Sequence, residues 1–85
     1  MSETIDELVR ELSEADTNDK ELFHNLIASA CEVLDLNDLS IAREFSASRS
    51  TVLRWKNGAA APHPTIRKHV YDYLKAQLNL KQYET

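Results

Sequence analysis

The sequence predicts an all-α protein, a compact bundle of about five helices in one domain that spans residues 1–85. Three observations support this fold class. Apolar residues recur every three or four positions in successive segments, which is the spacing of a buried helix face. No segment alternates apolar and polar residues as a half-buried strand does. The chain has one glycine and two prolines, so we expect no long loops.

An acidic helix is expected over about residues 4–14, appended to the rest of the domain. Thr4 and Glu7 match a capping box, in which the threonine side chain caps the helix and the glutamate reaches back to it. The apolar stripe of this helix comprises Ile5, Leu8, Val9 and Leu12. The charged residues opposite the stripe are those of an ordinary solvated helix face.

The next helix, over about residues 19–34, is the most apolar segment and should form the core. Asn18 and Glu21 are its expected cap pair. Its apolar positions follow the helical period closely. They are Leu22, Phe23, Leu26, Ile27, Ala30, Val33 and Leu34.

The final helix is expected over about residues 65–80, after Pro62 and Pro64 have held the preceding segment extended. Its predicted buried stripe is Ile66, Val70, Tyr73, Leu74 and Leu80, with Leu78 at the edge. The side chains predicted to point outward are Arg67, Lys68, Tyr71 and Lys75, and Lys68 is spaced to pair with Asp72. Residues 82–85 are expected to fray.

Two short helices joined by a tight turn are expected between residues 38 and 58. The first, over about residues 38–45, begins after Asn37 and faces the core with Leu39, Ile41, Ala42 and Phe45. Residues 46–48 form the break. Ser48 is the expected N-cap of the second helix, over about residues 49–57, and Gly58 can take the left-handed conformation that ends it.

The second of these helices has two different faces. At about 100° per residue, Val52 and Trp55 lie on one side and face the core. The other side carries Ser50, Leu53, Arg54 and Asn57, with Arg49 and Lys56 at its flanks. The small Ala42 lets the two helices cross at close range.

At these positions the chain resembles the helix-turn-helix of the phage Cro and repressor-type (Xre-like) transcriptional regulators. The matching features are an Ile-Ala pair in the first helix, a small residue at the turn, Ser-Arg-Ser-Thr at residues 48–51, and Trp55 and Gly58 at the close. The resemblance covers about residues 36–64, and its motif core is Ile41, Ala42, Phe45, Val52 and Trp55.

The chain departs from that family at two places. The turn usually carries glycine and then a branched aliphatic residue, whereas this chain has Ser46 and Ala47. Asp38 stands where the family often places an amide that touches phosphate. A carboxylate repels phosphate, so we expect a lower affinity for DNA.

The resemblance implies sequence-specific binding of double-stranded DNA, with the helix at about residues 49–57 in the major groove. The candidate base-contacting residues are Arg49, Ser50, Leu53 and Arg54, because arginine pairs with guanine and leucine can meet a thymine methyl. The candidate phosphate-contacting residues are Ser48, Lys56, Asn57, His63 and Arg67.

The resemblance also implies a repressor-like, prokaryotic or phage-encoded protein of the cytoplasm, associated with the nucleoid and acting as a homodimer. Two surfaces are candidates for the dimer contact. One is the final helix, through Tyr71, Lys75 and Leu78. The other is the acidic N-terminal helix.

The charge is divided unevenly along the chain. The net charge is −4. Residues 1–38 contain eleven acidic and two basic residues, a net −9, and residues 39–85 contain three acidic and eight basic residues, a net +5. The basic half favours DNA. The acidic half favours an alternative function, a protein-interaction module of antirepressor or antitoxin type that binds a basic partner.

Other function classes find little support. No glycine-rich phosphate loop and no Ser-His-Asp arrangement is present, so we expect no enzyme and no cofactor. His24, Cys31, His63 and His69 include no closely spaced pair of ligands, so we expect no metal site. His24 should be a surface imidazole and Cys31 a semi-buried thiol. With one cysteine, no apolar run of membrane length and an acidic N-terminus, the sequence indicates neither a disulfide, a membrane span nor a signal peptide.

Overall fold

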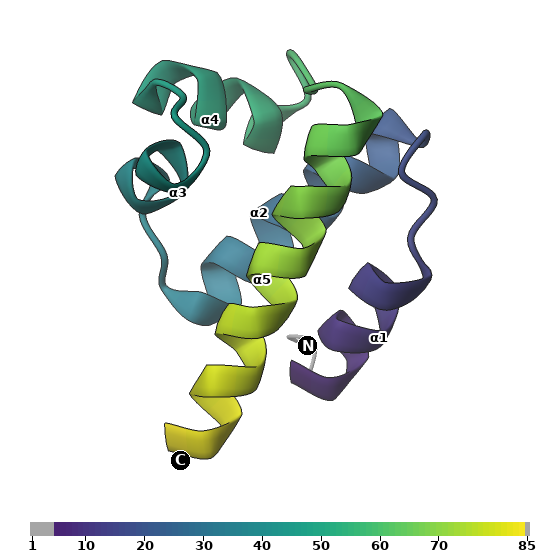
Figure 1. The fold of residues 1–85 in the computed structure, drawn as a ribbon, viewed down its shortest axis with the longest axis vertical. Coiled ribbons are helices and arrows are strands. Elements are labelled where there is room, and N and C mark those ends of the chain that lie inside the picture. The colour runs from purple at the N-terminus through teal and green to yellow at the C-terminus, as the bar shows by residue number, and fades with distance from the viewer. Residues whose placement is uncertain (1–4, 85) are drawn as a thin grey trace.

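The computed structural model describes residues 5–84, and the described residues form five α-helices and no β-strand (Figure 1). This confirms the predicted fold class. The helices are α1 (Ile5–Glu14), α2 (Lys20–Leu34), α3 (Asp38–Glu44), α4 (Arg49–Asn57) and α5 (Pro64–Glu84). Thr4, the predicted cap of α1, lies outside the described residues.

Helix α5 runs the length of the molecule, and α1 and α2 both pack against it (Figure 1). Helix α3 packs on α4, and α4 in turn packs on α2. Figure 1 shows α4 and the C-terminal end of α5 at opposite ends of the molecule. The body formed by α1, α2 and α5 therefore supports the α3–α4 pair from one side.

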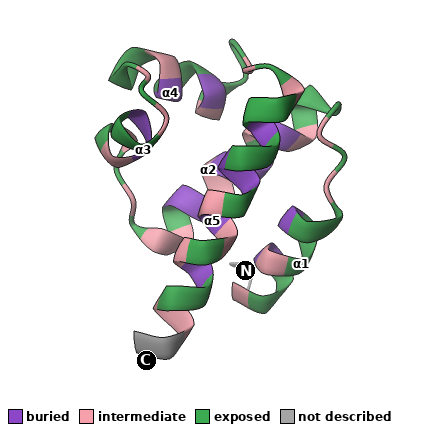
Figure 2. Cartoon of the chain, viewed as in Figure 1, coloured by how far each residue is buried: buried purple, intermediate pink, exposed green. Residues whose placement is uncertain are grey.

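One hydrophobic core joins all five helices, and Figure 2 marks buried residues on each of them. Phe23 of α2 lies at its centre, with its ring centroid 6.2 Å from that of Trp55 and 5.8 Å from that of Tyr71. Such tilted and edge-on ring pairs stabilise a core beyond their buried area. Helix α2 is therefore the core helix, as predicted, and Cys31 is buried in it, at 4% exposed, rather than semi-buried.

The N-terminal helix is docked on the body by its apolar stripe. Leu8 and Leu12 are buried, and Ile5 and Val9 are partly buried.

Helix α2 begins differently from the prediction, because its N-cap is Asp19, whose carboxylate accepts a hydrogen bond from the Leu22 amide at 3.0 Å. The predicted Asn18–Glu21 cap pair is wrong.

The buried face of α5 also differs from the prediction. Arg67 and Tyr71, which were expected to point outward, are buried, and Leu78 is fully buried rather than at the edge. Ile66 and Leu80, expected inside, are exposed. Tyr73 is only half-buried, whereas Val70 and Leu74 are buried as expected.

Two smaller expectations for α5 also fail. The helix continues to Glu84, beyond the expected end at about residue 80. Asp72 forms its ion pair with Lys75 at 3.3 Å, one turn C-terminal to it, and not with Lys68. The Asp72 side chain is half exposed, so this pair contributes little to stability.

Arg67 is buried because two loops supply acceptors for its guanidinium group. Its Nε donates to the Pro62 carbonyl at 2.8 Å, and its Nη1 donates to the Thr17 carbonyl at 2.6 Å. The charge-assisted hydrogen bonds replace those that the group would make with water. Arg67 thereby ties the α1–α2 loop to the α4–α5 loop across 50 residues of sequence.

We expect Arg67→Met to lower the free energy of unfolding by about 3 kcal/mol, because it keeps the aliphatic stem but leaves two carbonyls without their donor. Urea unfolding followed by circular dichroism measures this change. The matched control is Lys68→Met, the same substitution at an exposed neighbouring position, which should change stability by less than about 0.5 kcal/mol. Equal effects of the two substitutions would contradict the role given to Arg67.

Candidate nucleic-acid interface

Helix α3 begins at a side-chain cap and presents one narrow face to the core. The side-chain Oδ1 of Asn37 accepts from the Ser40 amide at 2.9 Å, as predicted for the N-cap. Ile41 and Ala42 are buried, and the half-buried Phe45 meets Tyr73 edge-on at 5.6 Å. Leu39 is 43% exposed, contrary to prediction, because it lies about 200° around the helix from Ile41.

The turn between α3 and α4 uses a strained residue. Ser46 has φ 53°, in the left-handed region that glycine adopts at little cost. Helix α3 is closed by a hydrogen bond from the Ala47 amide to the Ala42 carbonyl at 2.8 Å. Ser46 therefore holds this left-handed conformation at a cost of about 1–2 kcal/mol.

Both ends of helix α4 carry capping residues. The Ser48 hydroxyl accepts from the Thr51 amide at 3.1 Å, and Gly58 ends the helix with φ 84°. A Cβ atom at Gly58 would lie 3.3 Å from the ring of His24, so that imidazole is packed against the helix end. His24 is half-buried rather than the surface group that the sequence suggested.

The two faces of α4 are separated as predicted. Val52 and Trp55 are buried, whereas Arg49, Ser50, Leu53 and Arg54 are all exposed. Within residues 5–84 neither arginine of α4 forms an ion pair, and Leu53 is 51% exposed. The exposed face therefore offers two free guanidinium groups, one hydroxyl and one apolar side chain.

The five candidate phosphate-contacting residues are not equally available. The Asn57 side chain accepts from the Ala59 amide at 3.0 Å, and His63 Nδ1 accepts from the Thr65 amide at 3.2 Å, but both residues are exposed. The exposed Ser48 uses its hydroxyl as the helix cap. Arg67 is buried and bound to two carbonyls, so that prediction is wrong.

Lys56 is held in an ion pair that sequence reasoning missed. Its Nζ lies 2.8 Å from Oδ1 of Asp38, and the two side chains are 27% and 14% exposed. The hydrogen bond to Asp38 is the main reason that the pKa of Lys56 is raised. The only hint in the sequence was that both residues lie in the two helices of the motif.

The Cys31 thiol lies close enough to this pair to interact electrostatically with both charges. Burial, the largest cause, raises its pKa to about 11, while Lys56 lowers it and Asp38 raises it. The thiol is therefore protonated at neutral pH and unreactive, since the thiolate is the nucleophile. Among the described residues, no three potential metal ligands cluster together.

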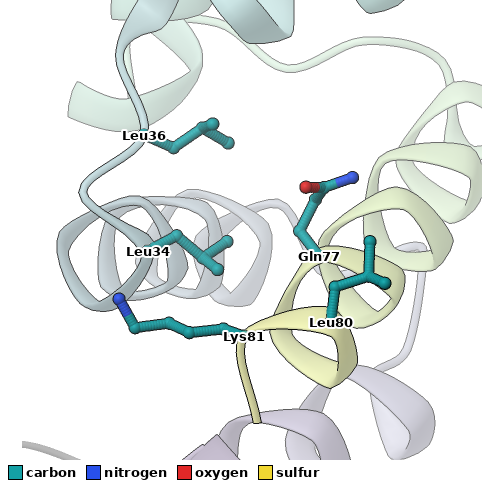
Figure 3. Close-up of a pocket in the computed structure, with 5 residues that line it drawn as sticks. All are labelled: Leu34, Leu36, Gln77, Leu80 and Lys81. Atoms are coloured by element: carbon teal, nitrogen blue, oxygen red, sulfur yellow. The ribbon is translucent and has the colours of Figure 1, made fainter. Parts of the chain in front are cut away.

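A shallow groove of about 180 Å³ lies between the end of α2 and the C-terminal half of α5 (Figure 3). Its lining consists of three leucines, an amide and one amine, which are Leu34, Leu36, Gln77, Leu80 and Lys81. These side chains contain no nucleophile with an adjacent base. The groove therefore offers no evident catalytic chemistry.

Comparison with known proteins does not assign the chain: no family model, curated protein or solved structure matches it. Among residues 5–84, no helix combines the length and the apolar character needed to cross a membrane.

We expect the free energy of unfolding to fall as the pH rises above about 9. The pKa of Cys31 rises from 9.0 to about 11 in the folded protein, and burial raises that of Tyr71 from 10.0 to about 12. Because the unfolded chain loses these protons first, their stabilising contribution is complete below pH 9 and is lost as the pH rises.

Urea unfolding at pH 8, 9, 10 and 11 tests this dependence. Cys31→Ala should reduce the loss between pH 9 and 11, because it removes one of the groups whose pKa is raised, even though it also lowers stability at every pH. A free energy of unfolding that stays constant from pH 8 to 11 would contradict the expectation.

Proposed function

We propose that this protein binds double-stranded DNA sequence-specifically, as a transcriptional regulator of the Cro and repressor type, with α4 in the major groove. One observation supports this above the others: α4 is capped at both ends, buried on one face and open on the other. A major groove admits a helix, and each base pair displays a distinct pattern of donors and acceptors there.

The exposed face of α4 has suitable chemistry for reading bases. Arg49 and Arg54 can each bind O6 and N7 of a guanine with two hydrogen bonds. Leu53 can contact a thymine methyl group, and Ser50 can donate to or accept from a base edge. Asn57 and His63, both exposed, are the remaining candidates for phosphate contacts.

The acidic helix does not oppose this proposal. Helix α1 packs along α5, and Figure 1 shows it well separated from α4. Surface charges more than about 10 Å apart are largely screened at ordinary ionic strength. The net charge of −4 is thus compatible with a basic face at α4.

The exposed acids support a second candidate function, an interaction module of antirepressor or antitoxin type that binds a basic partner. Those of α1 and the α1–α2 loop are Asp6, Glu7, Glu11, Glu14, Asp16 and Asp19. This function would use the face of the molecule opposite α4. The DNA titration described below separates the two candidates.

Homodimerisation is part of the proposal. Of the two predicted surfaces, the final helix is not free as expected, whereas the acidic face of α1 remains exposed. Tyr71 and Leu78 are buried within one chain, and Lys75 is paired with Asp72. The apolar stripe of α1 is covered by the body. In a prokaryotic or phage setting, such a regulator would act in the cytoplasm, at the nucleoid.

We expect the protein to bind random-sequence duplex weakly, with an affinity that falls steeply with salt, and to enrich a defined sequence on selection. Arg54→Ala should weaken binding to the selected sequence by about 5- to 150-fold and relax the preference at one base pair. Fluorescence anisotropy and repeated selection measure these effects.

The control for this substitution is Arg10→Ala, which makes the same charge change at an exposed position of α1. It should leave both affinity and preference nearly unchanged. If the wild-type protein fails to bind duplex even at 50 mM salt, the DNA proposal is overturned and a basic protein partner becomes the leading candidate.

We expect two chains to bind each selected site, on half-sites one helical turn apart. Sedimentation of the protein with labelled duplex gives the stoichiometry directly. A half-site duplex should bind one chain and with much lower affinity. Full affinity for a half-site duplex would show that one chain suffices.

A further inference from the structure

The ion pair between Asp38 and Lys56 joins the start of α3 to the last turn of α4. The two residues are 18 positions apart in the sequence, and Lys56 Nζ donates to Asp38 Oδ1 at 2.8 Å. Both side chains are largely shielded from water, at 27% exposed for Lys56 and 14% for Asp38. A shielded, hydrogen-bonded pair is held much more firmly than an exposed one.

The pairing separates Lys56 from the other basic side chains of α4. Arg49 and Arg54 are exposed, and within the described residues they form no ion pair. Lys56 lies about 20° around the helix from Arg49, beside the exposed face. It is thus at the flank where a phosphate strand would pass, but its charge is already neutralised.

Lys56 cannot exchange Asp38 for a phosphate without penalty. If Lys56 turned to a phosphate, Asp38 would be left as a partly buried carboxylate without its partner. Breaking a shielded pair in this way is unfavourable, because the remaining charge has lost both water and counter-charge. The approaching phosphate would also repel the carboxylate.

We propose that Asp38 limits the affinity of this protein for DNA by withholding Lys56 from the phosphate backbone. This inference rests on the DNA-binding function proposed above. Phosphate contacts carry no sequence information. Asp38 therefore weakens binding to all sequences by the same factor, and base recognition by α4 accounts for a larger share of the total affinity.

The test is Asp38→Asn, which keeps the shape of the side chain but removes its charge. One additional lysine–phosphate contact should steepen the slope of log Kobs against log salt by about 0.9. At 0.1 M salt this corresponds to binding that is about eightfold tighter. The gain should be the same for random duplex and for the selected sequence.

Four further variants make the result specific. Asp35→Asn removes a neighbouring exposed acid and should leave the slope unchanged. Lys56→Met should also leave the wild-type slope unchanged, and combined with Asp38→Asn it should abolish the gain. Asp38→Glu, which keeps the charge, should behave as wild type. Urea unfolding confirms that each chain is folded before binding is measured.

Each outcome decides the proposal. A flatter slope for Lys56→Met overturns it, since Lys56 would then already contact phosphate. Equal effects of Asp38→Asn and Asp35→Asn overturn it too, because only general charge would matter. Tighter binding by Asp38→Asn than by wild type, lost again in the double variant with Lys56→Met, supports it, whereas absence of binding by every variant overturns this inference together with the DNA-binding proposal.

Discussion

The burial of two side chains, Val52 and Trp55, is the interaction on which the candidate interface depends. A helix of nine residues is not stable alone in water, so α4 exists because this face is packed and both ends are capped. Trp55 meets Phe23 of the core helix edge-on at 6.2 Å. The packing of Val52 and Trp55 in the core therefore determines in which direction the exposed side chains of α4 point.

Helix α5 and its buried Arg67 help to fix the position of α4 relative to the rest of the core. Arg67 binds the carbonyl groups of Thr17 and Pro62, so it fixes the loop that leaves α4 relative to the loop that enters α2. Phe23 lies between Trp55 and Tyr71 and so links α4 to α5 through α2. The exposed face of α4 is therefore held in place by contacts that the helix makes on its buried side.

Much of the fold was predictable because its boundaries are marked by local chemistry. Residues such as Asn37, Ser48 and Gly58 end or begin helices through bonds and dihedral angles that residue type alone indicates. The exposed face of α4 was predictable for the same reason, from a 100° period over a short segment.

Which face of α5 is buried was not predictable, because apolar residues occur on more than one side of this helix. The buried face includes Arg67, which hydrophobicity assigns to solvent, and its acceptors lie in distant loops. The pairing of Lys56 with Asp38 was not predictable for a similar reason, since it joins two helices.

Trp55 is the single tryptophan of the chain and is 5% exposed at the inner face of α4. Its fluorescence is therefore an internal reporter of whether that helix is packed on the core.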